Sequence, residues 1–162
     1  MYNTAVQLRL IEQRLADRLG EVLGRGSSYR VTDFTEYYID EFGSDLMKQF
    51  YVFRNPVVLE DFYKIKIWSN TIETTIDQST DSTTRSVNID PGYLEPSKLV
   101  LFSTKNFSHR IYCGSGIYAE VTMPYARGDF IKLPWTYSDY YSEDNRRFLV
   151  NMRDCIINIL RK

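Results

Sequence analysis

Side chains that could carry out acid–base chemistry gather in one stretch of the second half of the chain. This stretch holds the only histidine, His109, together with Asp90, Lys105 and the charged residues Arg110 and Glu120. An imidazole is the natural proton-transfer group near neutral pH, because its ordinary pKa lies there. We therefore predict a catalytic set made of Asp90, Lys105 and His109.

A second group of polar residues could hold an anionic ligand. Lysine and arginine bind phosphate and carboxylate groups through charge-assisted hydrogen bonds. Lys66, Asn70 and Glu73 recur at i, i+4 and i+7, so they share one stripe of a predicted helix. Asn88 shares one face of a predicted strand with Asp90. The predicted ligand-binding residues are Lys66, Asn70, Glu73, Arg85, Asn88, Arg110 and Glu120.

The sequence predicts no protein-bound transition metal. The two cysteines, Cys113 and Cys155, are not spaced in the sequence like a pair of metal ligands. One histidine is too few for a typical zinc site. A magnesium ion held through the oxygens of Asp90 and Glu120 is the one cofactor that the anionic-ligand interpretation leaves open. The same charges also have a plainer interpretation, as structural ion pairs and a solvated helix face.

Length and composition limit the classes of partner. A chain of 162 residues fits a single domain, residues 1–162, with its own core. The net charge of −1 argues against nucleic-acid binding, which needs a basic surface. No apolar run is long enough to span a bilayer, so we expect no membrane partner and a cytoplasmic protein. The two cysteines are expected to be buried free thiols.

Hydrophobic periodicity predicts helices at both ends of the chain and two in the middle. The third predicted helix begins at Asn55, a capping side chain, followed by proline at the first helical position. Short polar side chains over 74–84 predict a flexible loop. The predicted helices span 6–23, 44–53, 55–73 and the chain beyond Ser142.

Alternating and continuous apolar runs predict the strands of a sheet. The continuous run 99–102 is typical of a central strand that is covered on both faces. Residues 90–92, Asp-Pro-Gly, predict a turn. Together with the helices, these segments predict an α+β fold, a single-layer and mostly antiparallel sheet packed by helices. The predicted strands are 29–35, 87–89, 98–104, 109–113 and 117–123.

Two of these strands are expected to form a hairpin. Its predicted loop is Gly114-Ser115-Gly116, with Cys113 opposite Ile117, because this register places the apolar residues of both strands on one face. The register puts His109 opposite Val121 on the apolar face and so separates it from the other charges. The remaining predicted pairs are Ile111 with Ala119, Tyr112 with Tyr118, and Arg110 with Glu120 as an ion pair.

Six blocks of the sequence are distinctive when taken together. They are T-E-Y-Y-I-D-E-F-G, K-I-K-I-W-S-N-T-I-E, R-S-V-N-I-D-P-G-Y-L, L-V-L-F-S-T-K-N-F-S-H-R-I-Y, G-I-Y-A-E-V-T and W-T-Y-S-D-Y. With them, most of the chain after residue 30 resembles an uncharacterised bacterial family, domain of unknown function 4416. The resemblance implies an apolar strand ahead of the first helix, where this chain has only Y-N-T after Met1. A sheet without that strand would expose an edge that invites association.

Two functions follow, because the resemblance carries no activity and the chain has no glycine-rich phosphate-binding motif. The first is a ligand-binding protein or enzyme for an anionic small molecule that bears a phosphate or carboxylate. It requires Asp90, Lys105, His109 and Glu120 to converge. The alternative is a non-enzymatic interaction module that binds a protein partner, or a second copy, through the aromatic segment 135–141. It requires dispersed charges and exposed apolar surface around Trp135.

Overall fold

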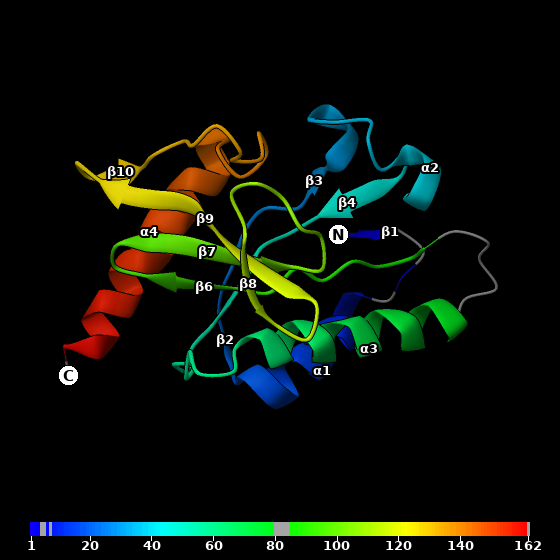
Figure 1. Cartoon of the computed structure of the whole chain (residues 1–162), viewed down its shortest axis with the longest axis horizontal. Coiled ribbons are helices and arrows are strands. Elements are labelled where there is room, and N and C mark those ends of the chain that lie inside the picture. Colours follow the sequence, from blue (N-terminus) through cyan, green and yellow to red (C-terminus); the bar gives the residue numbers. More distant parts are fainter. Residues whose placement is uncertain (4–5, 7, 80–84, 162) are drawn as a thin grey trace. The chain divides into compact units, whose positions relative to one another are not determined.

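The computed structural model describes the chain except residues 4–5, 7, 80–84 and 162 (Figure 1). Two compact units are present, the first made of Met1–Pro56 and Asn70–Ile89, the second of Val57–Ser69 and Asp90–Lys162. The described residues form four α-helices and ten β-strands, and all strand pairs are antiparallel. The predicted α+β class is confirmed, with the strands in three sheets where one was expected.

The first unit contains two small sheets beside a hydrophobic core. One core cluster consists of Val31, Phe42 and Leu46, all nearly inaccessible to solvent, with Met1 and Tyr38 packed against them. One sheet has the order β1 (Tyr2–Asn3), β4 (Leu46–Lys48), β3 (Tyr29–Arg30), and the other pairs β2 (Val22–Arg25) with β5 (Tyr51–Phe53). A short strand, β1, therefore does stand ahead of the first helix, as the family resemblance implied.

The first helix is shorter than its apolar periodicity predicts. Helix α1 spans Leu8–Leu19 and is followed by Gly20, whose φ of 88° lies in the left-handed region. A Cβ atom at Gly20 would lie 2.2 Å from the Asn55 side-chain nitrogen. The Asn55 side chain therefore packs against the end of α1, and its predicted role as the cap of a third helix is wrong.

Two further helix predictions in this region are corrected. Residues 44–53 form strands β4 and β5 in place of a helix, because short apolar runs fit both periods and only pairing with β1, β2 and β3 decides between them. The short helix α2 (Ile39–Phe42) precedes them. Of the predicted strand 29–35 only β3 is extended, since Val31–Asp33 form a 3₁₀ turn.

Helix α3 spans Tyr63–Ser79, so it begins later and ends later than predicted. The Thr74 and Thr75 hydroxyls donate to the backbone carbonyls of Asn70 and Thr71, which accommodates these polar side chains within the helix. The first six residues of the predicted flexible loop 74–84 are therefore helical, and the rest lie outside the described residues. The predicted strand 87–89 is reduced to a single bridge between Tyr2 and Val87.

The second unit is built on a five-stranded antiparallel sheet. Its order is β10 (Asp129–Phe130), β9 (Ile117–Ala126), β7 (Lys98–Ser103), β6 (Gly92–Glu95), with β8 (Ile111–Gly114) also on β9. The predicted central strand is confirmed, since β7 lies between β6 and β9 and its four apolar residues are buried (Figure 1). One hydrophobic core cluster of this unit consists of Phe62, Val100, Phe102 and Ile117.

The predicted turn at residues 90–92 is wrong, because neither Asp90 nor Pro91 lies in a turn and Gly92 is part of a strand. Gly92 lies in β6 opposite Leu101, where a Cβ atom would stand 2.4 Å from the Val100 carbonyl oxygen. Residue 92 must therefore be glycine because the backbones of two strands approach closely here, and not because a turn requires it.

The β8–β9 hairpin keeps the predicted register with a different loop. Ile111 pairs with Ala119 and Tyr112 with Tyr118, as predicted. Gly114 then stands opposite Ile117, and the ladder shifts at Cys113, which becomes a bulge. The loop is thus Ser115-Gly116, with φ of 51° and 77°, the positive values that a two-residue hairpin loop requires.

The last helix, α4 (Glu143–Leu160), begins directly after Ser142, as predicted. Both cysteines are free, but the expectation that they are buried is wrong, because Cys155 is exposed and Cys113 is half-buried. The described residues include no helix that has both the length and the apolar character needed to cross a membrane.

A stability change at alkaline pH is expected from Tyr51 in the first unit. Burial raises the pKa of the Tyr51 phenol to about 12, and the nearby Glu12 carboxylate acts in the same direction. In the unfolded chain the tyrosine phenol has a pKa of about 10. Between these two values the folded state holds a proton that the unfolded state has lost, so the free energy of unfolding falls as the pH rises.

Urea unfolding of the wild type and of Tyr51→Phe across this pH window measures the effect. The variant also loses the hydrogen bond from the Tyr51 hydroxyl to Gln49 Oε1, which lowers its stability at every pH. The informative quantity is therefore the slope against pH, which should be shallower in the variant. Equal slopes would show that Tyr51 ionises normally.

Candidate functional site

A buried carboxylate, that of Glu120, is the centre of the candidate site in the second unit. Its side chain is 1% exposed, and both His109 Nε2, at 2.8 Å, and Arg110 Nε, at 2.7 Å, contact the same oxygen, Oε2. The predicted ion pair between Arg110 and Glu120 is therefore present. The predicted separation of His109 from this pair is wrong, because β8 begins only at Ile111 and strand alternation does not govern the two residues before it.

Arg110 connects this carboxylate to three other parts of the second unit. Its Nη1 donates to Ser103 Oγ at 3.2 Å and to the Lys105 carbonyl oxygen at 2.8 Å, and its Nη2 donates to the Tyr137 hydroxyl at 3.1 Å. With the bond to Glu120, four of the five guanidinium N–H groups are used inside the protein. Arg110 therefore positions its neighbours, and only one of its guanidinium N–H groups is left for a ligand.

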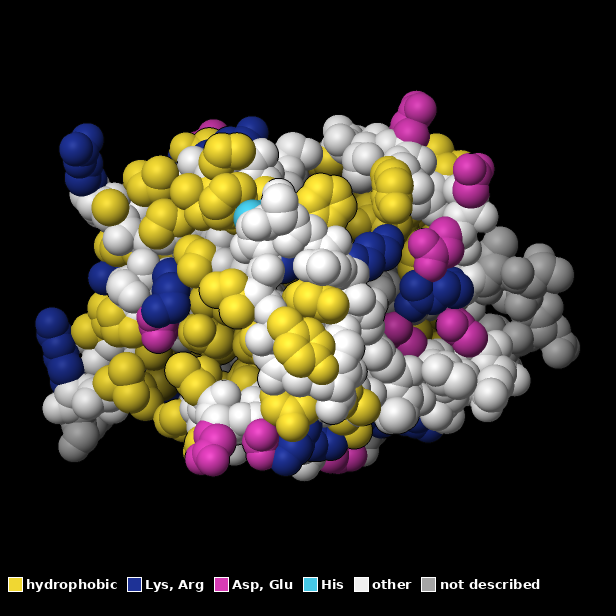
Figure 2. Space-filling view, viewed as in Figure 1, with side chains coloured by type: hydrophobic (Ala, Val, Ile, Leu, Met, Phe, Trp, Pro, Cys, Tyr) yellow, Lys and Arg dark blue, Asp and Glu magenta, His cyan; other side chains and the backbone are white. Residues whose placement is uncertain are grey.

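His109 is held in one orientation by two contacts. Its ring stacks on Trp135 with the ring centres 4.7 Å apart and an interplanar angle of 7°. The Trp135 indole nitrogen in turn donates to the Val121 carbonyl oxygen at 2.9 Å. An ionised carboxylate only accepts hydrogen bonds, so Nε2 carries the hydrogen toward Glu120 and Nδ1 is the acceptor in the neutral ring. The His109 side chain is 14% exposed, and Figure 2 shows it at the surface among hydrophobic side chains.

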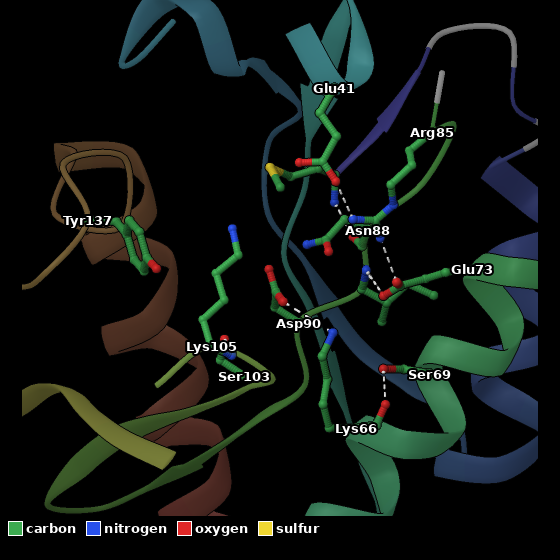
Figure 3. A network of polar contacts seen from close by, with 12 residues as sticks. Glu41, Lys66, Ser69, Glu73, Arg85, Asn88, Asp90, Ser103, Lys105 and Tyr137 are labelled. Atoms are coloured by element: carbon green, nitrogen blue, oxygen red, sulfur yellow. Dashed lines mark hydrogen bonds and ion pairs between the residues drawn. The ribbon is translucent and has the colours of Figure 1, made fainter. Parts of the chain in front are cut away.

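A second ion pair, between Lys66 and Asp90, lies in the same unit. Lys66 Nζ is 3.3 Å from Asp90 Oδ1, and the lysine side chain is only 4% exposed against 29% for the aspartate. In Figure 3, Lys66 points toward Asp90, and Lys105 and Tyr137 lie on the other side of that carboxylate. The partly solvated Asp90 carboxylate thus offsets the desolvation of a buried ammonium group.

Tyr137 links the two ion pairs electrostatically. Burial raises the pKa of its phenol above the ordinary value, and the Glu120 and Asp90 carboxylates also raise it, although Arg110 acts in the opposite direction. The phenol is therefore protonated at neutral pH and can accept the hydrogen bond from Arg110. Six predicted site residues belong to the second unit: Lys66, Asp90, Lys105, His109, Arg110 and Glu120.

Three residues of this centre lay outside the predicted set. Ser103, at the end of β7, accepts from Arg110 and from the Lys105 backbone N–H at 3.1 Å. Trp135 and Tyr137 belong to the segment to which the alternative function assigned a partner. Their amphipathic rings were the available signal, because such residues commonly support polar sites as well as interfaces.

The other four predicted residues, Asn70, Glu73, Arg85 and Asn88, belong to the first unit. Arg85 donates to Glu41 at 2.6 Å and to Glu73 at 2.8 Å, and the second Glu73 oxygen accepts from the Ile89 backbone N–H at 2.7 Å. The Arg85 guanidinium also lies 5.0 Å from the Phe42 ring centre. Figure 3 shows Arg85 with its bonds to both carboxylates. This network ties the segment before Asp90 to α2 and α3.

Asn70 and Asn88 contribute through their backbones. The Asn70 carbonyl accepts from Thr74, and the Asn88 carbonyl accepts from the amino terminus of Met1 at 2.6 Å. The stripe residues Lys66, Asn70 and Glu73 do lie on one helix, α3, as predicted. Of the predicted ligand-binding residues in the first unit, Glu73 and Arg85 take part in an ion-pair network.

Among the residues that the structure describes, no three His, Cys, Asp or Glu side chains lie close enough together to hold a metal ion. Asp90 and Glu120 form ion pairs with Lys66 and Arg110 respectively.

Comparison with known proteins identifies one family. The model of a family described as a domain of unknown function, DUF4416, matches residues 1–155, which confirms the resemblance seen in the sequence blocks. No curated protein and no solved structure matches the chain. The description of the family names no ligand or reaction, so chemistry has to be inferred from the residues themselves.

Proposed function

We propose, for a chain that belongs to the DUF4416 family, that the second unit binds a small anionic molecule and that His109 exchanges a proton with it. The observation that carries the proposal is the buried Glu120 carboxylate, which holds His109 and Arg110 through one oxygen atom. A buried charge that orients the only histidine is typical of sites that handle protons. A cytoplasmic location is part of the proposal and is supported by the two free cysteines.

The balance of charge in this centre favours an anion. Lys66, Lys105 and Arg110 contribute three positive charges, and Asp90 and Glu120 contribute two negative charges, so these five side chains sum to +1 with His109 neutral. Each carboxylate is paired with a buried cation, Lys66 or Arg110. Lys105 is an exposed residue just past the end of β7. A lysine ammonium group there suits a phosphate or carboxylate ligand.

His109 is the group suited to act on such a ligand. Glu120 and Trp135 hold its ring from the side and from one face, which fixes the direction in which Nδ1 points. A fixed imidazole loses little entropy when it takes up or releases a proton to a bound molecule. In this proposal Glu120 and Arg110 are positioning residues, whereas Lys105 and His109 contact the ligand.

The interaction module remains a second proposal with its own supporting observation. Phe107, Ile111 and Tyr112 are all more than half exposed and follow one another closely in the chain. The aromatic segment 135–141 offers less exposed apolar surface for a partner, because Tyr140 is 4% exposed and Trp135 packs on His109. Failure to bind any anion would favour a partner protein at the exposed residues.

A thermal-unfolding screen with inorganic phosphate, sugar phosphates, nucleotides and small carboxylates tests the proposed function. A ligand present at 100 times its Kd should raise the free energy of unfolding by about 2.7 kcal/mol. Lys105→Gln should weaken the binding of the best ligand by roughly ten- to a hundred-fold, the value of a charge-assisted hydrogen bond.

Lys132→Gln is the matched control, because Lys132 is an exposed lysine of the same unit whose ammonium lies 5.8 Å from the Tyr141 ring centre. This variant should bind like the wild type. Two results count against the proposal: no ligand in the panel shifts the unfolding temperature, or the two lysine variants weaken binding equally.

A further inference from the structure

His109 presents one of its two ring nitrogens to solvent. The hydrogen bond of the ring runs through Nε2 to Glu120 Oε2 at 2.8 Å, and the described part of the chain gives the ring no other. Among the described residues that are not exposed, no buried side-chain nitrogen or oxygen lacks a hydrogen-bond partner. Because Nδ1 has no such partner, it is accessible to solvent, and in the neutral ring it carries a lone pair.

The stacking of the ring leaves this lone pair open. Trp135 covers one face of the imidazole, with the ring centres 4.7 Å apart and the planes inclined by 7°. The lone pair of Nδ1 lies in the plane of the imidazole, so a ring stacked on its face does not cover it. His109 is therefore held in place while Nδ1 stays available for bond formation.

Glu120 stabilises the product of an attack by Nδ1. When Nδ1 forms a bond to an electrophile, Nε2 keeps its hydrogen and the ring becomes positively charged. The Glu120 side chain, which is 1% exposed, accepts that hydrogen, and water screens its charge little. A carboxylate in this position stabilises an imidazolium, as in the catalytic triads of hydrolases. Nδ1 of His109 is thus a stronger nucleophile than the same atom of a solvated histidine.

We propose that His109 accepts a phosphoryl group on Nδ1 from a small phosphoryl donor. This inference rests on the proposed function and adds a covalent step to it, with the donor as the bound anion. The local charges favour a phosphoryl group over an uncharged acyl group. His109 and Arg110 contact the same Glu120 oxygen, so after the attack two positive charges stand against one negative charge. A phosphoryl group supplies the negative charge that balances them, and arginine suits its oxygens.

Phosphoramidate is the probe, and its reaction balances without a further reactant. The lone pair of Nδ1 forms the new N–P bond while the P–N bond of phosphoramidate breaks. The nitrogen of phosphoramidate is already protonated, so it leaves as ammonia with the electron pair of the broken bond. The positive charge of the ring remains on His109, opposite Glu120.

Phosphorus NMR and intact-mass measurement of the full chain at mildly alkaline pH follow the reaction. His109 is the only histidine, so every phosphohistidine signal belongs to it. The folded chain should give the Nδ1 isomer alone, because Glu120 occupies Nε2. The same chain unfolded in urea should give both isomers. The folded chain should also react roughly ten- to a hundred-fold faster, the value of a hydrogen bond to a charged group.

Two variants assign the effect to the buried carboxylate. Glu120→Gln should lose the gain in rate over the unfolded chain. Glu95→Gln is the matched control, since Glu95 forms an ion pair with Lys98 on the same sheet, and it should react like the wild type. Urea unfolding verifies that each variant is folded under the reaction conditions. If Glu120→Gln is not folded, the comparison of the folded wild type with its unfolded state decides alone.

The outcomes separate this inference from the function on which it rests. A folded chain that is not phosphorylated, that reacts no faster than the unfolded chain, or that yields the Nε2 isomer would overturn the inference. Binding of phosphates in the thermal-unfolding screen would then leave the proposed function standing. A screen in which no anion binds, together with an unreactive His109, would remove both.

Discussion

Replacing Glu120 by glutamine is expected to destabilise the fold by about 3–5 kcal/mol, the usual cost of removing one partner from a buried ion pair. The Glu120 side chain is 1% exposed and that of Arg110 is 5% exposed, so water cannot substitute for the lost charge. Glutamine keeps the shape and can place its one acceptor oxygen where Oε2 stands, but it removes the negative charge that Arg110 and His109 both contact.

Urea unfolding of the wild type and Glu120→Gln measures the change. Glu95→Gln is the matched control, because Glu95 forms a partly exposed pair with Lys98 on the same sheet and should cost less than about 1 kcal/mol. The double variant Glu120→Gln with Arg110→Met should cost less than the sum of the single changes, since it removes both charges of one interaction. A loss as small as that of the control would mean that Glu120 is accessible to solvent.

The Lys66–Asp90 pair is expected to respond asymmetrically to the loss of each partner. Asp90→Asn should destabilise the protein by about 1–3 kcal/mol, because it leaves the ammonium of Lys66, which is 4% exposed, without this carboxylate. Lys66→Met should cost less. It replaces the buried cation by an apolar side chain of similar length, and the remaining carboxylate is 29% exposed and can be hydrated.

Denaturant unfolding of the two single variants under the same conditions decides this point. The free energy of unfolding should fall with denaturant concentration at the same slope in both variants. The two denaturation midpoints can then be compared directly as stabilities. If Lys66→Met proved the more destabilising change, the lysine rather than the aspartate would be the partner on which the local structure depends.

The helices and strands whose local sequence pattern fits only one kind of secondary structure could be predicted. The apolar run over 99–102 has no polar side, so it indicates a strand covered on both faces, which is β7. Helix α4 begins directly after Ser142, where its long apolar stripe begins, although the Ser142 side chain makes no capping hydrogen bond. The pairing of Ile111 with Ala119 followed from matching the apolar faces of two strands, and it survived the change of loop because the bulge at Cys113 absorbs one residue.

Segments with two acceptable local interpretations could not be predicted. Residues 44–53 fit a short helix or two short strands, and pairing with distant strands chose the strands. Threonine-rich sequence after Glu73 suggested a loop, but hydroxyl-to-carbonyl bonds let α3 continue through it. In both cases, contacts or bonds beyond the apolar pattern supplied the deciding free energy.

In the candidate site, too, some features could be predicted from the sequence and others could not. Asp90, Lys105 and His109 could be singled out from residue type alone, because charges and the only histidine within a sheet-forming stretch need partners. The contact of His109 with Glu120 could not, since it depends on two residues that lie just outside a strand. Tyr137 is 27 residues from Arg110, and no local pattern connects them.

The sequence by itself determined the α+β class, the central strand, the last helix and the kinds of side chain available for chemistry. These depend on periodicity and residue type, which are properties of neighbouring positions. Only the tertiary structure decided that Glu120 holds both His109 and Arg110, and that Arg85 serves a network in the first unit. Which donor meets which acceptor depends on bringing distant segments together, and the cost of leaving buried charges unpaired selects the pairs that form.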